Sequence, residues 1–388
     1  MEKQEEWLRK RAIQRYLRSE KAGPICVSLG RTERWLYKWL KRYQEGDAEW
    51  YLERGRAPIH LPGRSPEDIE EIVKFVRLEL YNRGDFCGAQ AIRWRLEEQR
   101  VEPLPCLRTI NRILARHGLT HRRTGRYEPK GKRYPALDAA HPGSVHQCDL
   151  VGPCYLGAPL RFYSLNAVDL ATGRCGIEPV LHGKGTVAES IWATWLRLGI
   201  PKYLQMDNEA PFYGSPAYPR ALGKPIRLCL LYGVQPCFIP LAEPWRNGVV
   251  EKFNDQWRQK FLARVPMENA EDLKRESLHF EQRHNDRYRY SKLNGRTPLE
   301  ALAAAKKPLR FPEQDRPPKF PLPKPKKGFY HVVRFIRSDA LFNLFGERFR
   351  MPSEAVYEYV WATVDVGRQQ LSFYLDSVII DEREFRLR

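Results

Sequence analysis

Three things that this sequence lacks narrow the range of proteins it can encode. Its eight cysteines form no Cys-X-X-Cys pair, which argues against a zinc finger or a disulfide framework and favours free thiols in a reducing compartment. No run of about 18 apolar residues is present, so a membrane-spanning helix is not expected. The opening Met-Glu-Lys-Gln-Glu-Glu does not resemble a signal peptide. We therefore expect a cytoplasmic protein without a membrane partner.

Acidic residues are the minority among the charged ones. The 388 residues include 66 Lys and Arg against 47 Asp and Glu, a formal charge of +19. Such an excess favours a polyanionic partner, with nucleic acid as the first candidate and an anionic membrane surface as the weaker one. Apolar residues make up 42%, enough for globular cores, and the length suits several domains.

The first helical segment, 1–62, predicts three short helices, the last two at 24–29 and 32–43. Gly30-Arg31 separates these two, and Thr32 can cap the second, which is the local pattern of a helix-turn-helix domain. An apolar stripe of Leu36, Leu40 and Tyr43 would face inward. The outward face carries the candidate DNA-binding residues Arg34, Lys38 and Lys41.

A second helix-turn-helix domain is predicted over 63–119, with helices at 66–82, 88–99 and 107–116. On the last of these, Ile110, Ile113 and Leu114 face inward. The outward face carries three further candidate DNA-binding residues: Arg108, Arg112 and Arg116. A basic face can also be ordinary solvated surface, but its occurrence in two such units favours DNA binding.

Two linkers flank the central region. The basic linker 120–143 holds the candidate DNA-binding residues Arg122, Arg123 and Arg126; it is either an arm along a DNA groove or backbone, or a simple tether. The Pro/Lys-rich linker 305–328 should be extended. After it, 329–388 predicts a small antiparallel β-barrel, with a hairpin around 367–370, whose role would be binding DNA or packing on another subunit.

The central region, 144–304, changes to strands mixed with helices. Strands are expected at 146–155, 162–170 and 175–180 as an antiparallel series, and further strands at 202–206 and 234–240. Helices are expected at 186–198 and over 247–284. Three hairpin strands followed by alternating helix and strand predict a mixed α/β sheet.

Three acids in this region suit phosphodiester chemistry, in which two metal ions roughly 3.5–4 Å apart flank the reacting phosphate. Asp149 interrupts an apolar strand, which is costly unless the charge is paired or bound to a metal. Asp207 directly follows a short strand, and Glu251 opens a helix whose apolar stripe leaves it on a second face with Asn247, Asn254 and Arg258. Magnesium or manganese prefers such carboxylate oxygens.

Each acid also has an ordinary structural interpretation. Asp149 could be a salt-bridged core acid, Asp207 a turn residue, and Glu251 a favourable charge in the first turn of a helix. Glu209 and Asp169 are rival acids, assigned to the loop after Asp207 and to a hairpin turn. The three acids occurring together, in this order along the predicted strands and helix, favour the metal site.

The region 144–304 resembles the catalytic core shared by retroviral integrases and many bacterial insertion-sequence transposases, the DDE superfamily. The resemblance is carried by Asp149-Leu-Val-Gly-Pro, Met206-Asp-Asn and Asn247-Gly-Val-Val-Glu-Lys-Phe-Asn, and by the segment 285–298. The two helix-turn-helix units are similar to those of insertion-sequence enzymes. The 43 residues between Asp207 and Glu251 exceed what is usual, and we place the excess in a loop around 213–219.

The resemblance implies an RNase H-like core in which Asp149, Asp207 and Glu251 bind two Mg²⁺ or Mn²⁺ ions. Arg258 occupies the position of a basic residue that contacts DNA, although a salt bridge to Asp255 or a hydrogen bond to Asn254 is the alternative. Trp245, in the loop before the catalytic helix, either stacks on an unpaired base or packs on the core.

The function expected is that of a nucleoid-associated DNA transposase or integrase, which cleaves element ends and transfers the 3′-OH to target DNA. Its partners would be double-stranded DNA and further copies of itself on paired ends, and the sequence identifies no helper protein. The alternatives are a catalytically silent regulator that binds DNA and a nuclease of the same fold that cuts without joining.

Overall fold

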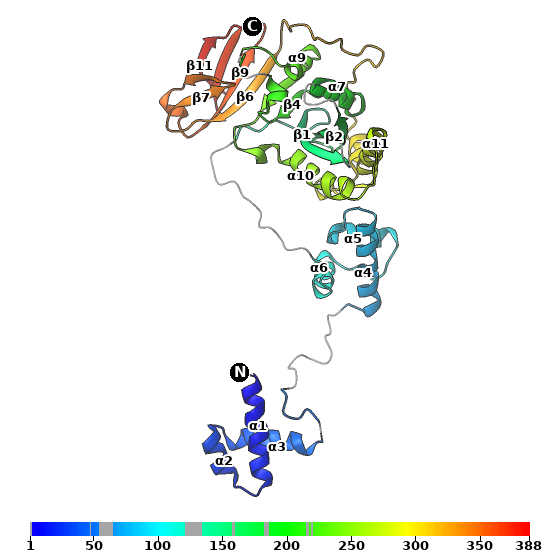
Figure 1. The fold of residues 1–388 in the computed structure, drawn as a ribbon, viewed down its shortest axis with the longest axis vertical. Coiled ribbons are helices and arrows are strands. Elements are labelled where there is room, and N and C mark those ends of the chain that lie inside the picture. Colours follow the sequence, from blue (N-terminus) through cyan, green and yellow to red (C-terminus); the bar gives the residue numbers. More distant parts are fainter. Residues whose placement is uncertain are drawn as a thin grey trace. The chain divides into compact units, whose positions relative to one another are not determined.

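The computed structural model describes residues 2–46, 48–53, 65–120, 134–156, 160–181, 186–214, 217–218 and 220–388. The chain divides into two compact units, Met1–Ser65 and Pro66–Arg388 (Figure 1). In the part of the chain described, no helix combines the length and the apolar character needed to cross a bilayer.

The first unit contains the three predicted helices, α1 (Glu2–Leu17), α2 (Ala22–Leu29) and α3 (Glu33–Gln44). Thr32 caps α3 as expected, because its hydroxyl accepts a hydrogen bond from the Trp35 N–H at 3.3 Å. The buried stripe of α3 is Leu36, Trp39 and Leu40. Our inclusion of Tyr43 was wrong, since 40% of its surface is exposed and Trp39, one turn before it, fills the core.

The second helical module consists of α4 (Glu67–Asn82), α5 (Ala89–Glu98) and α6 (Leu107–Arg116). The predicted inward residues of α6, Ile110, Ile113 and Leu114, are buried against α4 and α5. Three acids in the first turn of α4 interact favourably with the helix dipole. The module therefore has its own small apolar core.

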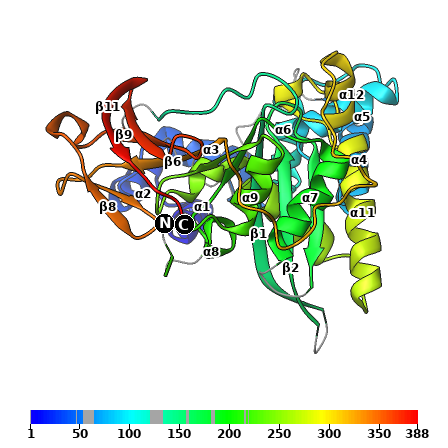
Figure 2. The ribbon, with the colours of Figure 1, turned by 90° about the horizontal axis from the view of Figure 1, so that it is seen from above.

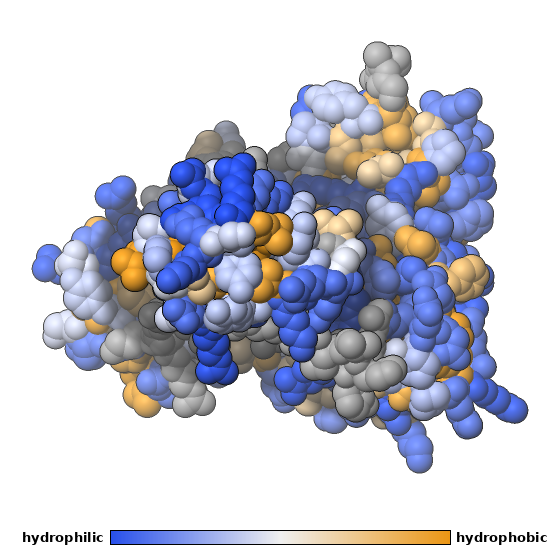
Figure 3. All heavy atoms as spheres, turned by 90° about the horizontal axis from the view of Figure 1, so that it is seen from below, coloured by the Kyte–Doolittle hydropathy of each residue, from blue (hydrophilic) through white to orange (hydrophobic). Residues whose placement is uncertain are grey.

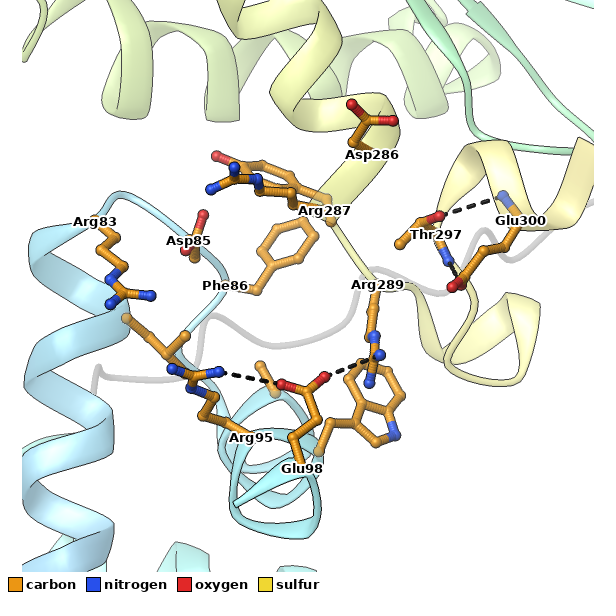
Figure 4. A pocket seen from close by; sticks show the side chains of 14 residues that line it. Arg83, Asp85, Phe86, Arg95, Glu98, Asp286, Arg287, Arg289, Thr297 and Glu300 are labelled. Atoms are coloured by element: carbon orange, nitrogen blue, oxygen red, sulfur yellow. Dashed lines mark hydrogen bonds and ion pairs between the residues drawn. The ribbon is translucent and has the colours of Figure 1, made fainter.

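This second module contacts the central region through the segment 285–298, which carried part of the resemblance. The Tyr288 hydroxyl donates to the Gly84 carbonyl at 2.7 Å. Gly295 has a φ of +80°, and a Cβ there would lie 2.9 Å from the Trp94 ring, so a side chain would clash. A cavity of about 340 Å³ lies at this junction. Figure 4 shows its lining side chains, among which Glu98 pairs with both Arg95 and Arg289. The segment thus joins the module to the core.

The predicted mixed sheet is present. β1 (Val145–Leu156), β2 (Leu160–Asp169) and β3 (Cys175–Val180) are antiparallel neighbours. β4 (Tyr203–Met206) pairs parallel with β1, and β5 (Gln235–Phe238) pairs parallel with β4. The order β3-β2-β1-β4-β5 leaves β1, which contains Asp149, and β4, which directly precedes Asp207, side by side at the centre.

Helices cover both faces of this sheet (Figures 1 and 2). α7 (Val187–Leu198) and α9 (Lys224–Leu231) pack on one face with Cys148 and Leu150 of β1. α10 (Gly248–Trp257) and α11 (Ala270–Arg287) pack on the other with Val151. Because strand side chains alternate, Asp149 shares the face of Val151. We call this side the α10 face.

The C-terminal region does not form the separate barrel that we expected. β6 (Phe329–Phe335) pairs parallel with β5, and β9 (Tyr359–Asp365), β10 (Gln370–Leu375) and β11 (Val378–Glu384) follow as antiparallel neighbours. The described residues thus build one nine-stranded sheet, with β7 (Leu341–Leu344) and β8 (Glu347–Arg350) as a separate hairpin. Since β5 occupies the edge of β6, the strands extend the central sheet instead of closing on themselves.

The helical stretch predicted over 247–284 is interrupted. α10 continues into a π-helical turn at Arg258–Leu262, and α11 starts afresh after Asn269, whose side chain accepts hydrogen bonds from the Glu271 and Asp272 N–H groups. Pro266 lies in the gap and disfavours a continuous helix. Two short helices complete the fold: α8 (Ala210–Tyr213) and α12 (Pro298–Ala304).

α11 also covers the β3 edge of the sheet. The Asn285 side chain accepts a hydrogen bond from the Cys175 N–H at 2.9 Å, and Glu281 accepts one from the Ile177 N–H at 2.8 Å. Side chains therefore occupy hydrogen-bonding positions that a further strand would need, which protects this edge from pairing with another chain.

Candidate active site

Asp149 lies in the middle of β1, half-buried, on the α10 face. Its Oδ1 accepts from the Leu150 N–H at 2.9 Å and its Oδ2 from the Asn254 amide at 2.6 Å. Burial raises the pKa of this carboxyl and the charge of Glu209 adds to the rise, while the hydrogen bonds and the positive charge of Arg258 oppose it. Asp149 thus lies within electrostatic reach of one acid, Glu209, and one cation, Arg258.

Asp207 lies at the carboxyl end of β4, next to β1. The parallel register pairs His146 with Leu204 and Gln147 with Gln205, so Asp149 and Asp207 each follow the last paired residue of their own strand by two positions. Burial raises the pKa of the Cys148 thiol, and the charges of both aspartates raise it further. Both aspartates therefore lie close to the same point of β1.

The turn after Asp207 is fixed by hydrogen bonds. The Asp207 side chain accepts from the Glu209 N–H at 3.0 Å. Asn208 donates to the Ile239 carbonyl at 2.6 Å and accepts from the buried Arg334 at 2.8 Å. The short loop at the end of β4 is thereby tied to β5 and β6.

Three amide side chains that were not assigned a role from the sequence pin the start of α10 onto β1 and β4. The Gln147 Oε1 accepts from the Val249 and Val250 N–H groups at 3.0 and 3.2 Å. Both Gln147 and Gln205 donate to the Arg246 carbonyl, at 3.2 and 2.8 Å. Asn247 donates to the Cys148 carbonyl at 3.0 Å. The first turn of α10 is therefore held directly beside both aspartates.

Glu251 belongs to this first turn. It lies on the helix face between Asn247, which contacts β1 at Cys148, and Asn254, which contacts Asp149. Burial raises the pKa of its carboxyl, and the neighbouring charges of Asp149 and Asp255 raise it further. Glu251 and Asp149 thus interact electrostatically across the junction of α10 and β1.

Asn254 itself is held by a buried chain of polar groups. The Ser164 hydroxyl donates to the Asn166 Oδ1 at 2.8 Å, and the Asn166 amide donates to the Asn254 Oδ1 at 2.8 Å. This chain leaves the Asn254 Nδ2 directed at Asp149. The signal in the sequence was a set of polar residues at positions whose neighbours along β1, β2, β4 and α10 are apolar.

One rival acid has a structural role. Burial alone would raise the pKa of Asp169, but the hydrogen bond and charge of His146, and further hydrogen bonds from Thr172 and the Gly143 N–H, lower it to about 2. The Thr172 N–H and hydroxyl both donate to its Oδ1 at 2.7 Å. Asp169 therefore stabilises the turn after β2, as expected, whereas Glu209 lies near enough to Asp149 to act on its pKa.

The chemistry of Asp149, Asp207 and Glu251 suits a hard divalent cation, because carboxylate oxygens are the preferred ligands and their mutual repulsion would be relieved by positive charge. Among the residues that the structure describes, however, no three His, Cys, Asp or Glu side chains are grouped tightly enough to hold a metal ion. The backbones of the three acids are brought to one place, and their side chains are not gathered there.

The candidate DNA-binding residues of the helical modules are exposed: Arg34, Lys38 and Lys41 on α3, and Arg108, Arg112 and Arg116 on α6. Lys38 Nζ also lies 3.4 Å from Glu53 and 4.7 Å from the centre of the Trp39 ring. Arg116 pairs with Glu70, which is only 3% exposed, and so also stabilises its own module. Arg122, Arg123 and Arg126 lie outside the described residues.

The two candidate DNA contacts of the central region flank α10, the helix that carries Glu251. Trp245 is 42% exposed, in the turn Pro244–Asn247 that precedes α10. Arg258 is exposed at the end of α10, and its charge acts on Asp149. The face of the molecule drawn in Figure 3 is mainly hydrophilic with scattered hydrophobic patches.

No model of a protein family matches this chain. The chain is similar to the HTLV-2 integrase catalytic core domain in complex with magnesium, with 16% identity and a TM-score of 0.33, over 42% of this chain and 99% of that one. It is also similar to a chain of the simian T-cell lymphotropic virus intasome in complex with PP2A regulatory subunit B56 gamma, with 14% identity and a TM-score of 0.36, over 71% and 85%. For the catalytic core domain of BIV integrase the values are 17% and 0.33, over 42% and 96%.

Proposed function

We propose that this chain is a DNA transposase or integrase, in which Asp149, Asp207 and Glu251 bind two Mg²⁺ or Mn²⁺ ions. Its substrates are the ends of a mobile element and target DNA, and further copies of the chain assemble on paired ends. The supporting observation is the amide clamp on α10: Gln147, Gln205 and Asn247 fasten the turn that carries Glu251 beside β1 and β4.

The chain's own residues prepare the site for a phosphodiester. Asp149 and Asp207 present carboxylates from adjacent strands, and Asn254 fixes the orientation of the first. Glu251 is half-buried in the first turn of α10. Its side chain would turn toward the two aspartates once bound cations offset the repulsion among the three carboxylates. When bound, two such ions activate the attacking hydroxyl and stabilise charge on the phosphate and the leaving oxygen.

Arg258 and the helical modules serve DNA in this proposal. Arg258 neutralises a phosphate beside Asp149, since its charge already reaches that carboxyl. The exposed basic residues of α3 and α6, together with the basic linker around Arg122, Arg123 and Arg126, bind the element ends. Trp245 stacks on a base next to the site.

The test is a joining assay with pre-cut element ends, target DNA and Mn²⁺. We expect joined products for the wild type and none for Glu251→Gln, with DNA binding retained by both. Products that are cut but never joined would identify a nuclease, and DNA binding without either reaction would identify a silent regulator. Loss of binding in Glu251→Gln would assign Glu251 a structural role.

A further inference from the structure

A group of aromatic side chains lies on the α10 face of the C-terminal strands. Along β9, Val360, Ala362 and Val364 are buried in the main core, while the alternate residues Tyr359 and Trp361 are half-exposed on the opposite side. Tyr374 of β10 pairs directly with Trp361. Aromatic rings at exposed sheet positions are not needed for the core, since the buried residues of β9 already supply it.

Together with Tyr134 these rings line a cavity of about 710 Å³, which we call the aromatic groove. The Tyr134 ring stands edge-on to Tyr359, with ring centres 5.3 Å apart. The Trp361 indole N–H donates to Thr363 at 3.1 Å and to His331 at 3.2 Å, which fixes its plane. The groove is within the size range of sites that hold small organic ligands.

The aromatic groove and the candidate acids share one face of the sheet. The strand registers run in an unbroken row from Gln205 to Cys237, His331 and Thr363. Two residues further along each strand, the same face carries Asp207 on β4 and Trp361 on β9. Three strand spacings, about 14 Å, separate β4 from β9.

Arg246 connects the two sites. Its carbonyl accepts the hydrogen bonds of Gln147 and Gln205 beneath the acids. Its guanidinium donates to the Tyr359 hydroxyl at 2.8 Å and lies 4.0 Å from the centre of the Tyr134 ring. The residue whose carbonyl holds the start of α10 therefore also contacts two of the rings that line the groove, Tyr134 and Tyr359.

We propose that the aromatic groove binds unpaired nucleobases of the DNA strand whose phosphate lies at Asp149 and Asp207, by stacking on Trp361 and Tyr374. This inference rests on the proposed function. Bases of any sequence stack on such rings, and the charge of +19 favours a nucleic acid over another aromatic ligand. A stacked strand rises about 3.4 Å per nucleotide, so 14 Å spans roughly four nucleotides, and a stretched strand spans it with roughly two. The bound bases should therefore lie roughly two to four nucleotides from the reacting phosphate.

The acidic groups at the groove agree with recognition of bases instead of phosphates. Asp376 lines it, and Glu243 accepts from the Tyr359 hydroxyl at 2.9 Å. Arg246, which contacts two of the lining rings, pairs with Glu243 at 2.9 Å, so its positive charge is already neutralised. Stacking then supplies the binding energy, and the phosphates of the strand point away from these acids.

The experiment uses the full chain and pre-cut duplex ends that carry a single-stranded flank, with 2-aminopurine at one flank position at a time and without divalent metal. We expect 2-aminopurine fluorescence to change most at two to four nucleotides from the duplex end. Trp361→Leu should weaken binding of the flanked end roughly 5- to 150-fold, and Trp361→Phe should restore most of it. Binding of a blunt end should stay unchanged.

Phe311→Leu is the matched control, because Phe311 is 50% exposed but lies outside the groove. Equal loss of flanked and blunt binding in Trp361→Leu, or no preferred 2-aminopurine position, would overturn the proposal. A proline-rich peptide added as a competitor should not displace the single-stranded flank. If the peptide binds the groove and the flank does not, the groove is a protein-binding site and the proposal is wrong. A 2-aminopurine signal without joining in Mn²⁺ would contradict the proposed function but support base binding in the groove. Joining without the signal would support the proposed function but contradict base binding in the groove.

Discussion

The α10 face has two halves, one over β1 and β4 and one over β9 and β10, and the two differ in the side chains that they carry above the same core. Over β1 and β4 the side chains are carboxylates and amides, joined by short hydrogen bonds such as that from Asn254 to Asp149 at 2.6 Å. Over β9 and β10 they are aromatic rings around a cavity. Beneath both, one continuous apolar cluster includes Leu204 and Val360. The core sets the fold of the whole sheet, and the alternate residues give each half its own chemistry.

The largest difference between the halves should appear on removing a carboxylate. Asp149→Asn or Glu251→Gln should lower joining by roughly 1,000-fold or more, because the oxygens proposed to hold the ions are lost. Binding of a single-stranded flank at the aromatic half should not change. Glu209→Gln, the rival acid in the same loop as Asp207, is the matched control and should keep most of the activity; if it fails instead of Glu251→Gln, the third ligand is Glu209.

A smaller effect is expected from the amide that orients Asp149. Asn254→Ala should reduce joining about 10- to 100-fold and raise the Mn²⁺ concentration needed for half-maximal activity, because a carboxylate without its supporting hydrogen bond binds metal less well. Gln259→Ala, an exposed change just beyond the same helix, should leave both values unchanged. An unaltered Mn²⁺ requirement in Asn254→Ala would show that the amide only supports folding.

Arg246 should be the one position that affects both halves. Arg246→Met keeps the length of the side chain but removes the hydrogen bonds to Tyr359 and Glu243. We expect joining and flank binding each to fall roughly tenfold, measured on the same preparation. Arg348→Met, at an exposed arginine of β8, controls for the loss of one positive charge. If Arg246→Met changes only joining or only flank binding, Arg246 does not couple the acids to the aromatic groove.

The smallest effect concerns stability and pH. Because the pKa values of Asp149 and Glu251 are raised in the folded chain, folding favours their protonated forms. Their unfavourable contribution is absent below the ordinary carboxyl pKa, appears as the pH rises toward the raised values, and is complete above them. Asp149→Asn should therefore raise the Tm by about 1–3 °C at pH 7.5 without metal, and less at pH 4. An equal shift at both pH values would exclude this origin.

Local patterns in the sequence predicted most of the helices and the central strands. The apolar spacing of Ile110, Ile113 and Leu114 and the cap at Thr32 are properties of neighbouring residues, and both predictions are confirmed. The pairing of β5 with β6 joins Cys237 to His331, and nothing near either residue specifies a partner so far along the chain. The C-terminal strands were therefore predicted as a barrel of their own.

The candidate site was predictable in part for the same reason. The order of Asp149, Asp207 and Glu251 along strands and a helix indicated where each backbone would lie, and their metal ligation stays a prediction. The roles of Gln147 and Gln205 depend on the Arg246 carbonyl, about 100 and 40 residues away in sequence, and a carbonyl has no signature in a sequence. The aromatic groove likewise appears only when β9, β10 and Tyr134 are brought together.

The most direct test of the central claim is a titration of Mn²⁺ followed by its electron paramagnetic resonance signal, with the chain bound to a pre-cut end at pH 7.5. The account predicts that the wild type removes up to two ions per chain from solution and that Asp149→Asn, Asp207→Asn and Glu251→Gln each bind fewer or bind more weakly. Titration curves that coincide for the wild type and all three variants would contradict it.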